Sequence, residues 1–332
     1  MRSLLDTAGE RVELTCAVPW IADVIAEGAA GELTPADGGE PDVRVTVERD
    51  SAAFDVRGWQ VLTRGAWYRE GQVVIGNACS SGLDLRVTMG GPTVELVARW
   101  RPSATGRAAA AVLRSRSRLL LRAVLLQYPA LWWSQQRGRA PLHASVCGLD
   151  AADGRTVMLA GPGGVGKSTL VHRELLSGAV STCDNVCVSD GQRTWGLVEP
   201  LRLPAEAHAG KGRRMPHGRR EAAWPRRTNQ MTPDLLVVLA RGGQPGVTRC
   251  DPALAARHLA AGTYMAGELR RYWAFAATLA LGTGLGGTHP PVQHVAQELS
   301  VRLPCLQVTL GDRPGAPLRE LLSAPIAEEV AS

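Results

Sequence analysis

The sequence predicts a two-domain protein of mixed α and β structure, in which a β-rich N-terminal domain precedes a C-terminal α/β domain. The 332 residues exceed the usual size of a single domain. Apolar and polar residues alternate in short runs through the first hundred positions, whereas after Gly138 apolar strands alternate with helical segments. We place the β-rich domain at residues 1–105, a connecting helical segment at 106–137 and the second domain at 138–332.

The N-terminal domain shows the two-residue period of half-buried strands. Turn signals separate these runs, including Asp37-Gly38-Gly39, Ser81-Gly82 and Gly90-Gly91-Pro92. An antiparallel sheet is the simplest prediction. The expected strands lie at 43–47, 54–62, 83–89 and 93–98.

The residue pattern of the connecting segment predicts one long helix at residues 108–127. Arg114, Arg118 and Arg122 are spaced four apart, so they fall on one face of it. This face is either a solvated surface or a docking surface for an acidic partner, and the sequence does not decide between them.

The second domain has strand patterns and helix patterns in alternation, as a sheet flanked by helices requires. A glycine at position 178 is placed to stop the first helix. The predicted strands are 156–160, 180–188, 235–240 and 306–310, and the predicted helices are 168–176, 252–261 and 266–281.

Composition excludes several classes of protein. Polar residues and a proline interrupt the most apolar stretch, 119–133, which is too short to span a membrane. The N-terminus lacks an apolar core with a cleavage site, so we expect a cytoplasmic protein without a membrane partner. The seven cysteines have no paired metal-ligand spacing, which favours unpaired thiols.

The formal net charge is +6, but Lys167 and Lys211 are the only lysines among 37 basic residues. A lysine is retained where a flexible ammonium group is needed, because arginine does not substitute well there. The basic residues form no aromatic-interleaved motif or zinc-finger spacing, so we do not expect a nucleic-acid partner.

A phosphate-binding motif follows the first strand of the second domain. Residues 161–169 read GPGGVGKST and satisfy G-x-x-x-x-G-K-[ST] between a strand and a helix. The glycines let backbone N–H groups form a nest for phosphate oxygens at a helix N-terminus. Lys167 would reach the β- and γ-phosphates, and the Ser168 hydroxyl would coordinate Mg²⁺. The predicted nucleotide-binding residues are Gly161, Pro162, Gly163, Gly164, Val165, Gly166, Lys167, Ser168 and Thr169.

A second acidic group is needed to accept a proton or to support the metal ion. The strand at 235–240 runs into Arg241 without an acid, so it lacks the aspartate that such a strand usually carries. Asp184, sixteen residues after Ser168, is the best alternative, and a turn aspartate is the competing interpretation.

The order of motifs over residues 141–310 resembles the HPr kinase-like family of P-loop kinases, which is grouped with PEP carboxykinase-like folds. The resemblance rests on PLHASV with His143, on GPGGVGKST, on CDNV with Asp184, and on PLRLP at 200–204. It implies a catalytic histidine at 143, and an aspartate pair whose first member takes the proton of the attacking hydroxyl. Here the pair is Asp184-Asn185, so one negative charge is missing, which places metal binding and any reverse phosphorylase activity in question.

A charged, loop-like segment follows PLRLP and contains Lys211, Arg213 and Arg214. It is either a solvated basic loop or a lid over the triphosphate that also binds an acidic substrate. The resemblance to the kinase family favours the lid.

The sequence therefore predicts an ATP- and Mg²⁺-dependent kinase that transfers the γ-phosphoryl group to a hydroxyl of a peptide, a protein or a small metabolite. Lys167, Asp184 and His143 are the expected catalytic residues, and Ser168 with Asp184 the expected metal partners. The alternative is a nucleotide-responsive regulatory module without net transfer. The oligomeric state stays open, a homo-oligomer included.

Overall fold

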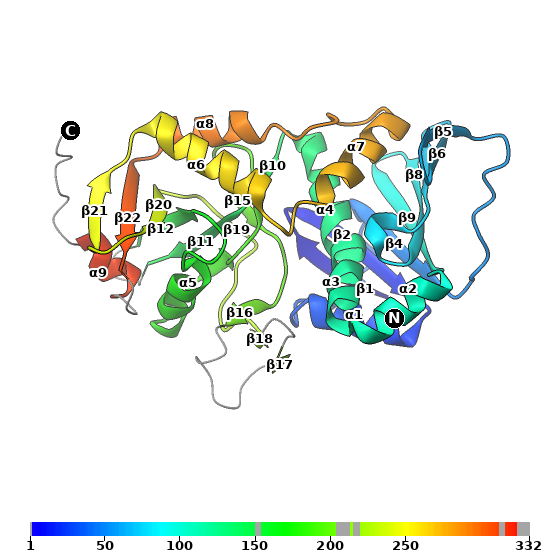
Figure 1. Cartoon of the computed structure of the whole chain (residues 1–332), viewed down its shortest axis with the longest axis horizontal. Coiled ribbons are helices and arrows are strands. Elements are labelled where there is room, and N and C mark those ends of the chain that lie inside the picture. Colours follow the sequence, from blue (N-terminus) through cyan, green and yellow to red (C-terminus); the bar gives the residue numbers. More distant parts are fainter. Residues whose placement is uncertain (1, 150–153, 204–212, 215–219, 312–315, 324–332) are drawn as a thin grey trace. The chain divides into compact units, whose positions relative to one another are not determined.

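The computed structural model describes the chain except for residues 1, 150–153, 204–212, 215–219, 312–315 and 324–332 (Figure 1). It is a mixed α+β protein with several sheets. The chain divides into two compact units, which are described separately. Unit 1 comprises Met1–Arg137, Val198–Pro200 and Arg271–Pro290, and unit 2 comprises Gly138–Leu197, Leu201–Arg270 and Pro291–Ser332. The helical segment 106–137 thus belongs to unit 1, and so does 271–290, which the sequence boundary assigned to the second domain.

Unit 1 contains a nine-stranded sheet in the order β3-β1-β2-β4-β9-β8-β7-β6-β5. The expected sheet was antiparallel, but β2 pairs with β4, and β4 with β9, in parallel. A parallel pair needs a crossover, which helix α1 (Pro19–Gly28) supplies between β2 and β4. The strands are β1 (Arg2–Thr7), β2 (Glu10–Cys16), β3 (Thr34–Pro35), β4 (Val43–Glu48), β5 (Gln60–Thr63), β6 (Ala66–Arg69), β7 (Gln72–Ile75), β8 (Leu83–Gly90) and β9 (Thr93–Trp100).

Three of the four predicted strands of this unit are present as β4, β8 and β9, but the strand expected at 54–62 is wrong. Only its end forms β5. The Asp55 carboxylate accepts a hydrogen bond from the backbone N–H of Arg57, which bends the chain. Phe54 is nevertheless buried, because the Arg99 guanidinium covers its ring at 4.3 Å from the centroid. The apolar residue therefore marks a packing contact and not a strand.

The single helix predicted at 108–127 is broken at Leu113, whose φ and ψ of −103° and 47° are not helical. Of the three arginines on its face, Arg122 is buried, Arg118 is partly exposed and Arg114 is exposed. Arg122 Nη2 lies 2.7 Å from Glu27 Oε1, and Arg118 pairs with the same carboxylate of α1. The C-terminal part of this face therefore packs against α1, whereas Arg114 stays exposed. The segment forms α2 (Ala104–Val112), α3 (Arg114–Arg122), a π-helical turn (Ala123–Gln127), α4 (Tyr128–Ser134) and a 3₁₀ turn (Gln135–Arg137).

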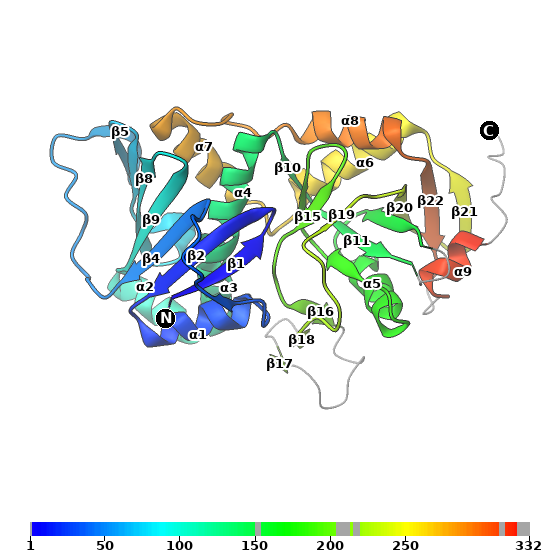
Figure 2. The same cartoon turned by 180° about the vertical axis from the view of Figure 1, so that it is seen from behind.

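Helices cover one face of the unit 1 sheet. Helices α3 and α4 lie in front of the strands in Figure 1 and behind them in the reverse view of Figure 2. Helix α7 (Tyr272–Thr283) packs against β5, β6 and β7. Its Tyr272 is fully buried, with its ring 5.6 Å from that of Tyr128.

Unit 2 is built on a six-stranded sheet in the order β13-β11-β12-β20-β22-β21. Strands β12, β20 and β22 are parallel, and the other pairs are antiparallel. Helix α5 (Lys167–Leu176) lies on one side of this sheet, and helices α6 (Pro252–Met265) and α8 (Val292–Arg302) lie on the other (Figure 1). The strands are β11 (Ala144–Gly148), β12 (Thr156–Ala160), β13 (Ser181–Cys183), β20 (Leu235–Arg241), β21 (Gly246–Arg249) and β22 (Cys305–Leu310).

Successive apolar side chains of the unit 2 strands point to opposite faces of the sheet, so helices must cover both faces. Val157 and Leu159 of β12 join a buried cluster with Leu170 and Val171 of α5, whereas the intervening Met158 has the opposite direction and is also buried. The smaller elements of the unit are β10 (Ala140–Leu142), β14 (Cys187–Ser189), β15 (Thr194–Gly196), β16 (Leu201–Leu203), β17 (Arg213–Arg214), β18 (Arg220–Ala222), β19 (Gln230–Met231) and α9 (Leu318–Ser323).

The strand predicted at 180–188 is two strands in different sheets. Strand β13 pairs with β11 in the large sheet, whereas β14 pairs with β10 and β15 in a four-stranded sheet. Asp184 and Asn185 lie between them, where the chain leaves one sheet for the other. The acidic motif therefore occupies a fixed corner and not the middle of a strand.

All seven cysteines are unpaired, as expected. Within the described ranges, no helix combines the length and apolar character needed to cross a membrane.

Candidate functional site

The P-loop joins the end of β12 to the first residue of α5. Gly161, Gly164 and Gly166 have φ values of 149°, 81° and 126°, which side chains other than glycine rarely adopt. A Cβ on Gly161 would also lie 2.9 Å from the carbonyl oxygen of Leu239. The loop thus curls directly in front of the α5 N-terminus, where unpaired N–H groups and the helix dipole favour an anion.

Lys167 is buried, with only 6% of its surface exposed. Its Nζ donates hydrogen bonds to the carbonyl oxygens of Gly161 at 2.7 Å and Pro162 at 3.2 Å. Burial lowers the pKa of the Lys167 ammonium to about 8, although the carboxylates of Glu268 and Asp184 act in the opposite direction. The ammonium group is therefore held at the loop by neutral carbonyl groups. An anionic ligand would replace these carbonyl groups as its partner and would attract the positive charge more strongly.

Asp184 is fully buried, and its carboxyl is close enough to the Ser168 hydroxyl for that hydroxyl to lower its pKa. Its Oδ2 accepts a long hydrogen bond of 3.4 Å from the Arg202 backbone N–H. Its Oδ1 is buried without a hydrogen-bond partner of normal geometry in the described part of the chain. Burial raises the pKa of this carboxyl, whereas the Arg202 charge and the Ser168 hydroxyl lower it.

This arrangement fits a magnesium ion held with a triphosphate. Mg²⁺ usually takes one or two protein oxygens, with the remaining positions filled by phosphate oxygens and water. The Ser168 hydroxyl lines the cavity and can supply one such oxygen, whereas Asp184 Oδ1 would supply a second once it becomes accessible from the cavity. The described residues contain no cluster of three or more His, Cys, Asp or Glu side chains that could hold a metal alone.

His143 and Asn185 form a second buried pair. His143 Nε2 lies 3.2 Å from Asn185 Oδ1, and the His143 backbone N–H donates to Thr263 Oγ1 at 3.0 Å. Burial lowers the pKa of His143 to about 4, and the neighbouring Lys167 charge adds to the effect. The imidazole is therefore neutral near pH 7. Asn185 Nδ2 is buried without a hydrogen-bond partner among the described residues.

An ion pair that the sequence analysis missed also faces this site. Arg202 Nη1 lies 2.5 Å from Glu268 Oε1. Burial would raise the pKa of Glu268, but the charge and hydrogen bond of Arg202 outweigh it and hold the pKa at about 2. Glu268 is therefore ionised at all physiological pH values.

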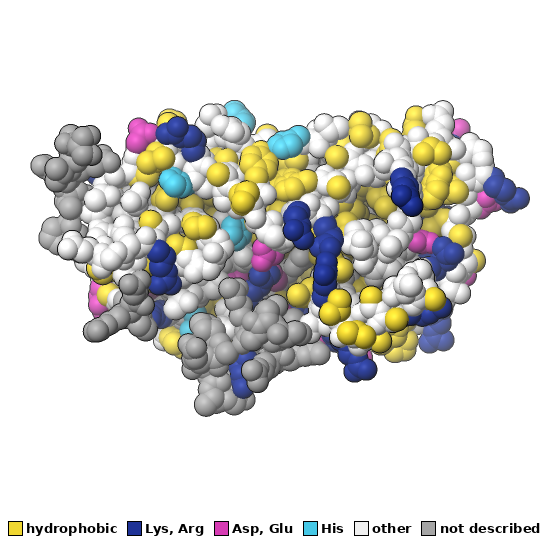
Figure 3. Space-filling view, in the orientation of Figure 1, with side chains coloured by type: hydrophobic (Ala, Val, Ile, Leu, Met, Phe, Trp, Pro, Cys, Tyr) yellow, Lys and Arg dark blue, Asp and Glu magenta, His cyan; other side chains and the backbone are white. Residues whose placement is uncertain are grey.

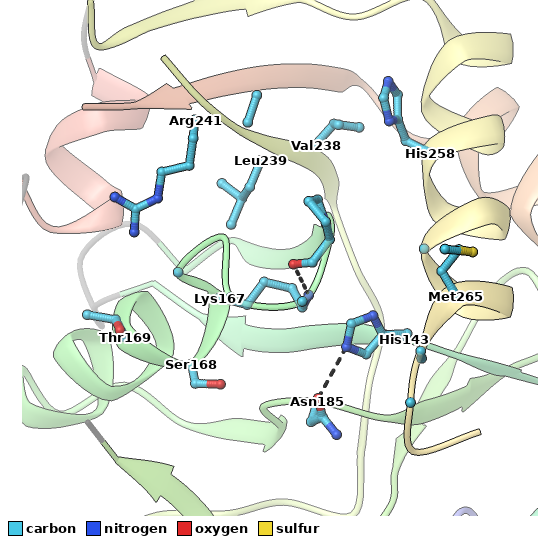
Figure 4. Close-up of a pocket in the computed structure, with 18 of the residues that line it drawn as sticks. His143, Lys167, Ser168, Thr169, Asn185, Val238, Leu239, Arg241, His258 and Met265 are labelled. Atoms are coloured by element: carbon cyan, nitrogen blue, oxygen red, sulfur yellow. Dashed lines mark hydrogen bonds between the residues drawn. The ribbon is translucent and has the colours of Figure 1, made fainter. Parts of the chain in front are cut away.

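Except for Asp184, the functional groups described above line one cavity of about 900 Å³, shown in Figure 4. Its size is within the range of small-molecule sites. In Figure 4 the Ser168 hydroxyl points toward Asn185, while Arg241 and Thr169 lie on the opposite side of the P-loop from His143 and Asn185. In Figure 3, acidic, basic and histidine side chains are scattered among hydrophobic and uncharged atoms on this face of the molecule. The lining residues used below are His143, Lys167, Ser168, Asn185, Arg202, Arg241 and Glu268.

The predicted residues differ in their relation to the cavity. Six further P-loop positions were expected to contact the nucleotide, and four of them line the cavity: Pro162, Gly163, Gly164 and Gly166. Val165 is instead buried in the core of the unit. Asp184 does not reach the cavity surface in this structure. Of the proposed lid residues, Lys211 lies outside the described residues, and Arg213 and Arg214 are described only as the backbone of β17.

Three residues of the cavity that carry a formal charge, Arg202, Arg241 and Glu268, were not predicted. Arg202 lies inside PLRLP, so the motif could have directed attention to it. Arg241 occupies the end of the strand at 235–240, where an aspartate was expected, and no role for the arginine itself was predicted. Glu268 follows α6 without any motif, and only the folded chain brings it to Arg202.

Comparison with known proteins gives no further assignment. No model of a known protein family matches this chain, and no curated protein matches it either.

Proposed function

We propose that this chain is an ATP- and Mg²⁺-dependent phosphotransferase of HPr kinase-like type, acting on a hydroxyl of a peptide or a small molecule. The observation that carries the proposal is the P-loop, whose buried Lys167 ammonium donates hydrogen bonds to the carbonyls of Gly161 and Pro162 at the α5 N-terminus. Triphosphate oxygens are the natural partners of such a group.

The residues of the cavity take complementary roles in this proposal. Lys167 and the P-loop amides hold the phosphates, and Ser168 and Asp184 supply oxygens for Mg²⁺, which offsets phosphate charge. The acceptor oxygen forms a bond to the γ-phosphorus as the bond to the β,γ-bridging oxygen breaks, and ADP leaves. The hydroxyl proton passes to Asp184, whose pKa is raised by burial and whose carboxyl must become accessible from the cavity for this step.

His143 is proposed to position Asn185 through the 3.2 Å contact of Nε2 with Oδ1. A neutral imidazole can hold this amide without adding charge beside Lys167. The Arg202 and Glu268 pair would face the acceptor at the same end of the cavity. The basic residues Lys211, Arg213 and Arg214 remain proposed as a lid.

A nucleotide-responsive regulatory module is the second candidate, and two observations favour it. Asp184 does not line the cavity, and Asn185 replaces a second acid. In this case ATP would bind to the P-loop without net transfer.

Incubation with labelled ATP and Mg²⁺, against a lysate or candidate acceptors, separates the two. A kinase produces ADP together with an acceptor heavier by one phosphoryl group in mass spectrometry. A regulatory module binds ATP with the same P-loop dependence and returns it intact. A protein that binds no triphosphate, with or without Mg²⁺, would contradict both.

A further inference from the structure

The order of strands gives the P-loop two chemically different sides. Parallel strands β12, β20 and β22 end at the same edge of the sheet, where ligands bind in open α/β sheets. On one side of β12, strands β11 and β13 lead to Asp184 and Asn185. On the other side, β20 ends at Arg241. The proposed phosphoryl transfer places the γ-phosphate toward Asp184 and Asn185, so the nucleoside must extend toward Arg241.

Arg241 is oriented by two backbone carbonyl groups. Its Nε donates to Val165 O at 3.1 Å, and its Nη1 donates to Gly311 O at 3.2 Å. These two bonds fix the plane of the guanidinium group. The residue is nevertheless exposed and lines the cavity. In the described part of the chain it forms no ion pair with a carboxylate.

A guanidinium group held flat at the rim of a nucleotide cavity is suited to an aromatic base. A guanidinium group stacks on π-systems and is weakly hydrated. Removing water from its face therefore requires less free energy than removing water from an ammonium group. The two carbonyl bonds also remove most of the rotational freedom that stacking would otherwise have to restrict.

On the basis of the proposed function, we infer that Arg241 binds the nucleobase, by stacking its guanidinium plane on the ring, and does not bind the transferred phosphate. Val165 and Gly311 position Arg241 for this contact. The P-loop then holds the triphosphate, and Arg241 distinguishes a nucleotide from an inorganic polyphosphate.

Binding of Mg·ATP and of Mg·tripolyphosphate, measured by calorimetry, tests this inference. Arg241→Ala should weaken ATP binding about tenfold, the loss typical of one stacked base, while tripolyphosphate binding stays within about twofold of the parent. Arg241→Lys keeps the charge but loses the plane and should behave in the same way, which preserves the test if the alanine variant does not fold. Arg249→Ala, an exposed arginine of β21 that does not line the cavity, is the matched control and should alter neither ligand.

Two results overturn the inference while leaving the P-loop proposal intact. Equal losses for ATP and tripolyphosphate would show that Arg241 supports the loop or binds phosphate, and no loss for either would show that it does not contact the ligand. A parent protein that binds neither ligand would instead refute the proposed function, and the inference with it.

Discussion

The depressed pKa of Lys167 predicts that triphosphate affinity falls as the pH rises above neutrality. With a pKa of about 8 in the ligand-free protein, the ammonium is roughly 90% protonated at pH 7 and roughly 10% protonated at pH 9. Nearby phosphate charge raises the pKa again, so the complex contains the protonated form. The apparent Kd for Mg·ATP should therefore increase about tenfold between pH 7 and pH 9.

Calorimetry in buffers of different ionisation enthalpy measures both consequences. Binding at pH 9 should take up close to one proton, and binding at pH 7 only about a tenth of one. Glu268→Gln should move the loss of affinity to lower pH, because the Glu268 carboxylate raises the pKa of Lys167. A Kd that is constant between pH 7 and pH 9, together with no proton uptake, would refute the reasoning.

Three substitutions test other parts of the structure. Lys167→Ala should greatly weaken ATP binding or turnover while circular dichroism stays unchanged, and unaltered affinity and turnover would contradict the P-loop assignment. Asp184→Asn should keep ATP binding within a few-fold but lower the rate of phosphoryl transfer by about 10²- to 10⁴-fold. Loss of Mg²⁺-dependent ATP binding would instead assign Asp184 to the metal. Phosphoryl transfer at the parent rate would show that another residue is the general base. Its control, Asn185→Asp, should be tolerated or alter only the metal dependence. Glu27→Ala should lower the free energy of unfolding by about 3 kcal/mol, because it leaves the buried Arg122 charge without this carboxylate; thermal melting at the parent temperature would show that the pair contributes little.

The P-loop could be predicted from sequence because its chemistry is local. The glycines with positive φ, the lysine and the serine are consecutive, and the strand before them and the helix after them have clear periods. Strands β4, β8 and β9 were predictable for the same reason, since each alternates with a period of two residues.

Features that depend on distant partners could not be predicted. Leu113 breaks the helix between an alanine-rich run and an arginine- and serine-rich one, with no glycine or proline to signal it. Arg118 and Arg122 pair with Glu27, about ninety residues away. The parallel pairing of β4 depends on a crossover through α1, which strand periodicity cannot show.

The cavity shows the same limit. Glu268 carries no motif and is identified only by its 2.5 Å contact with Arg202. Asp184 was predicted from its separation from Ser168 along the sequence. Its complete burial, however, depends on the point where the chain passes from the sheet of β13 to the sheet of β14. The sequence could indicate that an aspartate is present near the P-loop, but only the fold shows whether solvent or substrate can reach it.

The division of unit 1 into three chain segments has a consequence for biosynthesis. Strands β5, β6 and β7 leave the ribosome long before α7, the helix that packs on them. More than 190 residues, including the whole P-loop, are translated between the end of β7 at Ile75 and the start of α7 at Tyr272. The nascent N-terminal sheet must therefore persist with part of its apolar face uncovered, and it becomes complete only after most of the phosphate-binding unit has been made. Chaperone engagement during this interval, or a slow folding phase that ends when α7 docks, would be the physiological result of this chain order.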